Sequence, residues 1–187
     1  MKENTRDKFI ETASNLFGKK GYNATGLNEI LAESGAPKGS LYYHFPKGKE
    51  QLALEALILA GNKITQSITS HIENIDNPIE AIIYNIENIA DIIDKEHKTR
   101  DITISLIALE TYLSSETLRK ACEDLYQSLE NIYADKLMKA GMSPEEAHEI
   151  GEVICAMMEG AITLSLTRQN GNPLRLIAKQ IPNIVKI

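Results

Sequence analysis

Apolar residues recur three or four positions apart along almost the whole chain, and this spacing limits the possible folds more than any other feature. The pattern is clear in residues 9–17 and again in residues 79–93. Such spacing places apolar side chains on one face of an α-helix, whereas a half-buried β-strand would alternate apolar and polar residues. No convincing alternation of that kind occurs, so the sequence predicts an all-α protein of about nine helices.

Glycine and proline residues divide the pattern into separate helices. Gly141 and Pro144 mark one stop and restart, where Ser143 is expected to cap the next helix and Glu146 to complete a capping box. Pro182 should kink or shorten the last helix. The earlier breaks are expected at Gly18 with Gly21, Gly35 with Pro37, and Pro46 with Gly48, and the later helices at about 49–74, 78–95, 101–113, 116–140, 144–169 and 173–186.

The composition indicates a folded protein of a reducing compartment. With 187 residues, of which 43% are hydrophobic, the chain is long enough to bury a real core. Cys122 and Cys155 stand outside any CxxC spacing, which argues against a disulfide scaffold or a zinc ribbon. The N-terminal residues lack a signal-peptide pattern, and the longest apolar run, residues 53–61, is shorter than the roughly 20 residues of a membrane span. We therefore expect a soluble, cytoplasmic protein without a membrane partner.

Charge is distributed unevenly along the chain. Residues 1–49 carry eight Lys and Arg against five Asp and Glu, a net of +3, so the remainder of a chain with net charge -6 carries -9. The acidic total excludes a generic polycation that coats nucleic acid. A basic N-terminal part on an acidic body fits a sequence-specific DNA binder, because only that part approaches phosphates, although a plain solvated charge pattern would also explain it.

Residues 25–45 have the spacing of a helix-turn-helix, with a tight turn at residues 34–36. Thr25 is expected to cap the second helix of the chain, where its hydroxyl and the free N–H groups behind it could bind a phosphate. Gly39 removes a side chain where the next helix would press against base edges, and Lys49 could neutralise a flanking phosphate. The shared apolar faces come from Leu27, Ile30, Leu31, Leu41 and Phe45, which leaves Lys38, Gly39, Ser40, Tyr42, Tyr43 and His44 on the outer face.

The residues at 9–18, the Gly-Tyr-Asn-Ala-Thr at 21–25 and the segment 35–50 together resemble the DNA-binding domain of the TetR family of bacterial repressors. The loop at residues 45–49 is one residue longer than the common family form and is similar to that of the LmrA/YxaF-type subgroup. The same subgroup resemblance continues in the body at residues 108–111, 118–122, 159–161 and 173–175. Pro37 departs from the family, in which many relatives carry a capping Ser or Thr, so the helix should survive while that hydroxyl contact to DNA is lost.

The resemblance implies a role for each residue of this surface. Thr25, Tyr42, Tyr43 and Lys49 would hold phosphates, whereas Lys38, Gly39, Ser40 and His44 would face bases or the groove edge. Partial core burial is the alternative for the two tyrosines, and simple packing at a helix end is the alternative for His44.

The family also forms a dimer and a ligand cavity from its C-terminal helices, and the sequence contains traces of both. Small residues follow one another at near-helical spacing in an apolar helix, although each mid-helix glycine costs about 1 kcal/mol against alanine. The dimer candidates are Gly151, Cys155, Ala156 and Gly160 with Leu174, Ile177 and Ile181 of the last helix, unless these residues serve packing within one chain. The ligand candidates are Tyr84, Asn88, Glu110, Tyr112, Tyr126, Met158, Glu159 and Thr163, each of which could instead belong to the core or face solvent.

Nothing in the sequence favours an enzyme or a metal site. There is no GxSxG, HExxH or phosphate-binding glycine loop, and the four histidines, at positions 44, 71, 97 and 148, lack metal-ligand spacing. We therefore expect no cofactor, and we divide the chain into a helix-turn-helix domain at residues 1–49 and a ligand-binding and dimerisation domain at residues 50–187.

The resemblance implies a homodimeric repressor that binds a palindromic operator and releases it when a small hydrophobic ligand enters the body. Subgroup similarity suggests efflux or detoxification genes as targets. Two alternatives stay open, a DNA-binding protein whose body only dimerises and an activator, because the effect on transcription depends on where the operator lies.

Overall fold

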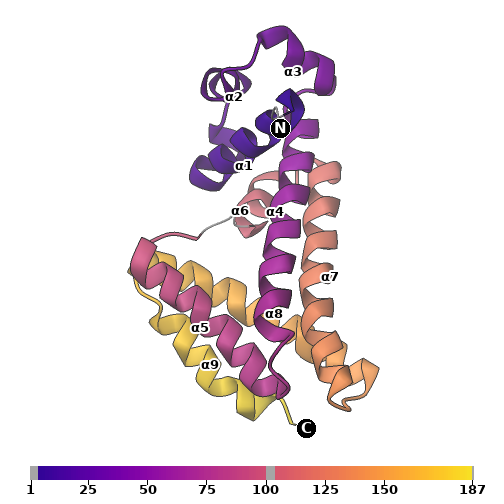
Figure 1. The fold of residues 1–187 in the computed structure, drawn as a ribbon, viewed down its shortest axis with the longest axis vertical. Helices are drawn as coiled ribbons and strands as arrows, with labels where there is room; N and C mark the ends of the chain where they lie inside the picture. The colour runs from indigo at the N-terminus through magenta and orange to yellow at the C-terminus, as the bar shows by residue number, and fades with distance from the viewer. Residues whose placement is uncertain (1–3, 100–103, 187) are drawn as a thin grey trace. The chain divides into compact units, whose positions relative to one another are not determined.

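The computed structural model describes residues 4–99 and 104–186, and all regular secondary structure in these two ranges is α-helical (Figure 1). The prediction of an all-α protein is therefore confirmed, and the breaks fall close to the expected glycines and prolines. The helices are α1 Thr5–Ala24, α2 Leu27–Ser34, α3 Lys38–His44, α4 Lys49–Ile72, α5 Pro78–Glu96, α6 Ile104–Thr111, α7 Glu116–Lys139, α8 Pro144–Arg168 and α9 Asn172–Ile184. The expected start of the sixth helix, at residues 101–103, lies outside the described residues.

The chain divides into two compact units. The first, called unit 1 below, contains residues 1–63 and 101–125, and unit 2 contains residues 64–100 and 126–187. Helices α4 and α7 each begin in unit 1 and end in unit 2. The boundary between the two compact units therefore differs from the boundary expected at residue 49 between a DNA-binding and a ligand-binding domain. The units differ from those domains because α1 packs against α6 as well as against α2 and α3.

Unit 1 is built around three buried aromatic rings. Phe9 and Phe45 meet edge to face with ring centroids 6.2 Å apart, and Phe17 is equally inaccessible to solvent. Helix α1 passes through Gly18, contrary to expectation, and loses helical geometry only at Gly21, where φ is 79° and ψ is 173°. A side chain would strain this backbone conformation, which is why the kink falls at the second glycine.

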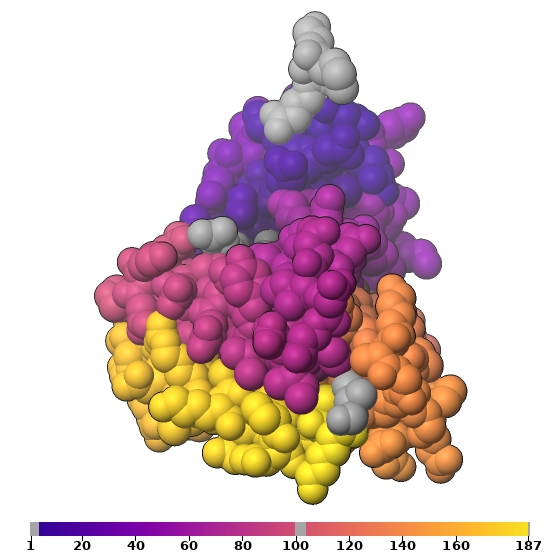
Figure 2. All heavy atoms as spheres, turned by 60° about the horizontal axis from the view of Figure 1, so that its bottom comes forward, coloured from indigo at the N-terminus to yellow at the C-terminus, as the bar shows by residue number. Residues whose placement is uncertain are grey.

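In unit 2, α9 packs against α5 and α8, and Figure 2 shows α5 and α9 side by side. Asp94 of α5 accepts the N–H of Gly171 at 2.6 Å and also binds Arg175 at 2.7 Å, which ties the start of α9 to α5. Ser143 caps α8 as expected, since its Oγ accepts the N–H of Glu146 at 3.3 Å. The last helix ends two residues after Pro182, slightly earlier than predicted.

By length and composition, α8 alone among the described helices could cross a membrane. The same properties belong to a helix in the core of a soluble protein, and α8 packs against α9 while burying Ile154, Met158 and Ala161. Packing within unit 2 therefore accounts for the buried face of α8.

Candidate nucleic-acid interface

The turn between α2 and α3 is closed by backbone geometry. Gly35 has a φ of 62° and donates its N–H to the Leu31 carbonyl oxygen at 3.2 Å, which ends α2 in the left-handed conformation that glycine favours. The Ala36 N–H binds Ser34 Oγ at 3.3 Å, and Pro37 then precedes the first residue of α3. Two short helices joined by a fixed three-residue turn are thus present where the sequence predicted a helix-turn-helix.

Thr25 does not cap α2, so that prediction is wrong. The cap position is occupied by Gly26, which supplies no side-chain hydrogen bond, because α1 resumes after its kink and ends only at Ala24. Thr25 is fully buried and its hydroxyl donates to the Gly21 carbonyl oxygen at 2.8 Å. Because this bond uses the single hydroxyl hydrogen, the Thr25 side chain has no donor left for a phosphate in this conformation.

Helix α3 turns four of the expected DNA-binding residues toward solvent. Lys38 and Gly39 are exposed, Tyr42 is 50% exposed and Tyr43 is 81% exposed. Partial core burial, the alternative for the tyrosines, is therefore excluded for Tyr43, whereas half of the Tyr42 surface is covered. Leu41 on the opposite face is completely buried, as is Phe45 just beyond the helix, so the helix is anchored from behind while its outer face stays open.

Ser40 and His44 are less available than their neighbours. Ser40 Oγ donates to the Pro37 carbonyl oxygen at 2.7 Å, which leaves only an acceptor for an outside partner. The His44 ring is half-buried and packs edge-on to Tyr43, with centroids 5.1 Å apart. A groove contact by either residue stays a prediction.

Lys49, the expected phosphate partner at the start of α4, lies over an aromatic ring. Its Nζ is 4.2 Å from the centroid of Tyr22, within the range of a cation–π interaction. Partial burial lowers the pKa of Lys49, and the Glu110 carboxylate opposes that shift. Lys49 is thus held beside the end of α1, and its phosphate contact stays a prediction.

Glu110, expected to bind a ligand, instead holds the last turn of α1. Its Oε2 accepts the N–H of Asn23 at 3.0 Å. A Cβ at Gly21 would stand only 2.5 Å from Glu110 Oε1, so the carboxylate occupies space that a glycine leaves open. The sequence offered no sign of this contact, since the two partners lie 87 positions apart.

The eight ligand candidates are divided between the two units. Glu110 and Tyr112 belong to unit 1, whereas the remaining six belong to unit 2. Tyr84, Tyr112 and Thr163 are exposed, and Met158 is buried. Asn88, Tyr126 and Glu159 have intermediate exposure, and Asn88 donates to the Tyr84 carbonyl oxygen at 2.8 Å.

A buried chain of polar groups in unit 2 escaped the sequence analysis. Asn85 Nδ2 donates to the Tyr133 hydroxyl at 2.9 Å, and that hydroxyl donates to Met158 Sδ at 3.2 Å. His71 Nδ1 lies 3.0 Å from Asn85 Oδ1. Burial raises the pKa of Tyr133 above its usual range. A single asparagine on the apolar face of α5 was the available clue, because a buried amide requires partners.

Four of the seven dimer candidates are buried within the chain itself. A Cβ at Gly151 would stand 2.7 Å from the Glu130 carbonyl oxygen, so close packing of α8 on α7 explains this glycine. For the four buried candidates, the expectation that they face a second copy is therefore wrong, because helices of the same chain already cover them. The buried candidates are Gly151, Cys155, Leu174 and Ile181; Ala156 and Gly160 are exposed, and Ile177 is half-buried.

The two cysteines are buried thiols. Burial raises the pKa of Cys122 to about 11 and that of Cys155 to about 12. Within residues 4–99 and 104–186, no three His, Cys, Asp or Glu side chains gather as metal ligands would.

Family comparisons agree with this arrangement of helices. Residues 9–56 match the model of bacterial regulatory proteins of the tetR family, and residues 78–180 match the C-terminal domain of LmrA/YxaF-like transcriptional regulators. The HTH-type transcriptional regulators YxaF and LmrA of Bacillus subtilis (strain 168) are 46% and 42% identical to the chain over 182 residues. Each alignment covers 97% of this chain, with 95% of YxaF and 97% of LmrA.

Solved structures show the same fold at low sequence identity. The reduced form of NemR from E. coli superposes with a TM-score of 0.86 at 19% identity, covering 98% of both chains. A TetR regulator from Legionella pneumophila gives a TM-score of 0.83 at 19% identity over the whole of both chains. Because both family models and the full-length relatives describe DNA-binding transcriptional regulators rather than enzymes, the chain belongs to the TetR family, with an LmrA/YxaF-like C-terminal domain.

Proposed function

We propose that the protein is a homodimeric repressor that binds a palindromic operator through α3. The observation that carries this proposal is the open outer face of α3, on which Lys38, Gly39, Tyr42 and Tyr43 stand together while Leu41 is buried behind them. The two tyrosines, with Lys49, would bind phosphates and set the register. Lys38, Gly39, Ser40 and His44 would lie toward base edges.

Dimerisation is assigned to the part of α8 that stays exposed. Val153, Ala156, Gly160 and Leu164 stand three or four residues apart, so they form one stripe along the helix, and each is exposed in the single chain. An added Cβ at Gly160 would meet nothing within 4 Å, which leaves room for a second helix. A two-fold axis through such a contact would bring two recognition helices roughly 34 Å apart, one turn of DNA.

Release is assigned to a small hydrophobic ligand in unit 2, where the Asn85, Tyr133 and Met158 chain offers polar groups inside an apolar surround. The ligand must bind the DNA-incompetent state of the protein better than the competent state, because a ligand with equal affinity for both states leaves their populations unchanged. Helix α4 would carry the change to the unit that contains α3, because it is continuous from Lys49 in unit 1 to Ile72 in unit 2.

Subgroup similarity favours efflux or detoxification genes as targets and a cytoplasmic location. The test is a salt-titrated binding assay of the purified protein on duplex DNA from upstream of its own gene, with and without a panel of hydrophobic compounds. Tight sequence-dependent binding that one compound abolishes supports the proposal. Tight binding that no compound disturbs favours a body that only dimerises, and a promoter that loses activity when the gene is deleted favours an activator.

A matched pair of tyrosine variants tests the interface itself. Tyr43→Ala removes an exposed ring from α3, and Tyr84→Ala removes an exposed ring from α5. The first should weaken operator binding without lowering the free energy of unfolding, whereas the second should leave operator binding unchanged. If the two variants bind the operator with equal affinity, the DNA-binding interface does not lie on α3.

A further inference from the structure

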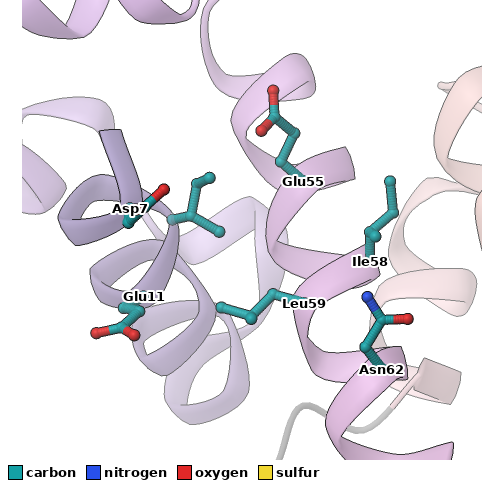
Figure 3. A pocket seen from close by; sticks show the side chains of 7 residues that line it. Asp7, Glu11, Glu55, Ile58, Leu59 and Asn62 are labelled. Carbon is teal, nitrogen blue, oxygen red and sulfur yellow. The ribbon is translucent and has the colours of Figure 1, made fainter. Parts of the chain in front are cut away.

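A hollow of about 500 Å³ lies within unit 1 between α1 and α4. Figure 3 shows it from close by, with Leu59 reaching from α4 toward α1. None of the residues that line the hollow belongs to the proposed operator contact. Its lining combines three carboxylates, Asp7, Glu11 and Glu55, with three branched apolar side chains, Ile10, Ile58 and Leu59.

The charge of this hollow is only partly balanced. Glu55 forms an ion pair with Arg6, a residue of α1. Within the described residues, Asp7 and Glu11 have no hydrogen-bonded or ionic partner, and both are exposed one turn apart on α1. Like charges at this spacing repel each other, so a positive charge between them would be favourable.

The apolar lining narrows the choice of cation. Ile58 is 48% exposed although it is a large hydrophobic residue, while Ile10 and Leu59 are more deeply covered. The three carboxylates do not converge as ligands of a metal ion would. A small hydrated cation would leave the exposed apolar surface uncovered, whereas an organic cation with a hydrophobic body would cover it and face the carboxylates at the same time.

We propose that the hollow between α1 and α4 binds a hydrophobic organic cation. The cation lies among Asp7, Glu11 and Glu55, and its apolar body contacts Ile58 and Leu59. The occupant therefore shares Glu55 with Arg6, whose guanidinium carbon also lies 5.6 Å from the Phe45 ring centroid beside the end of α3. Occupancy is thus linked to the residues that hold α1 against α4, independently of any ligand in unit 2.

The experiment uses two probes of nearly the same shape and opposite charge, tetraphenylphosphonium and tetraphenylborate. Binding of each to the full chain is measured by equilibrium dialysis without DNA, so the result does not depend on the operator. We expect saturable binding of the phosphonium and none of the borate. The double variant Asp7→Asn with Glu11→Gln should weaken phosphonium binding roughly fivefold, since two exposed charge contacts are lost.

Two further variants locate the probe. Ile58→Lys puts an ammonium group into the hollow from an exposed position and should abolish phosphonium binding, while Glu33→Gln removes an exposed acid of α2 outside the hollow and should change nothing. Unfolding curves would establish that every variant is folded. The proposal is overturned if the phosphonium does not saturate, if the borate binds equally well, or if the double variant binds as tightly as the wild type.

Discussion

Replacing Gly21 by alanine tests how the end of α1 is held. The residue has a φ of 79° and a ψ of 173°, a region that side chains avoid at a cost of about 1–3 kcal/mol. The new Cβ would also stand 2.5 Å from Glu110 Oε1, so the carboxylate must move and release the Asn23 N–H. Because Asn23 is exposed and water can replace the lost acceptor, that second loss is about 1 kcal/mol.

The two contributions together predict that Gly21→Ala lowers the free energy of unfolding by about 2–4 kcal/mol, or the melting temperature by roughly 5–15 °C. Circular dichroism during heating measures the melting temperature, and Gly18→Ala is the matched control. Gly18 is exposed within the regular part of α1, so alanine there should stabilise the protein by about 0.5–1 kcal/mol.

A double-mutant cycle separates backbone strain from the carboxylate contact. In a Glu110→Ala background no carboxylate remains to be displaced, so Gly21→Ala should cost only its backbone strain. Operator affinity should fall in Gly21→Ala, because α2 follows this turn directly. Two results would contradict the contact between α6 and α1. One is a melting temperature of Gly21→Ala equal to that of the wild type, and the other is strict additivity of the Gly21→Ala and Glu110→Ala effects on the free energy of unfolding.

Three other predictions concern separate parts of the molecule. Lys49→Ala should weaken binding to all DNA sequences alike and reduce the slope of log affinity against log salt by about one unit. Lys38→Ala should instead relax discrimination at one base position. Filter binding to several DNA sequences at several salt concentrations distinguishes the two effects. Tyr133→Phe leaves a buried amide without its partner and should lower the free energy of unfolding by about 1–3 kcal/mol in urea titrations, while Tyr84→Phe should have no effect. The Gly171 N–H, with Arg175, lowers the pKa of Asp94, so the stability that Asp94 adds is present above about pH 4 and is lost as the pH falls further. In urea titrations, the difference in free energy of unfolding between wild type and Asp94→Asn should therefore shrink on acidification. A difference that stays constant with pH would contradict this assignment.

Local chemistry made the helices predictable. Glycine and proline act within one turn of the chain, so Gly35, Pro37 and Pro78 mark boundaries that tertiary packing has little reason to move. Thr25 was misplaced because the sequence does not reveal that α1 resumes for one turn after Gly21. The cap therefore shifted by one residue, to Gly26.

Contacts between distant segments could not be predicted in the same way. No local pattern links Glu110 to Asn23, since the charge of one meets the backbone of the other only after folding. The apolar faces that include Leu174 and Ile181 were correctly identified as faces that must be covered. Periodicity does not say whether the same chain or a second copy covers them, and here α5 and α8 of the same chain do so.

The buried cysteines have a consequence for the chemistry of the cell. A thiol with a pKa of about 11 or 12 is ionised in roughly one molecule in 10⁴ or 10⁵ at pH 7, and the thiolate is the form that attacks peroxides, quinones and other electrophiles. Cys122 and Cys155 are therefore expected to react with oxidants more slowly than exposed thiols of low pKa, so these two residues are poorly suited to sensing oxidants.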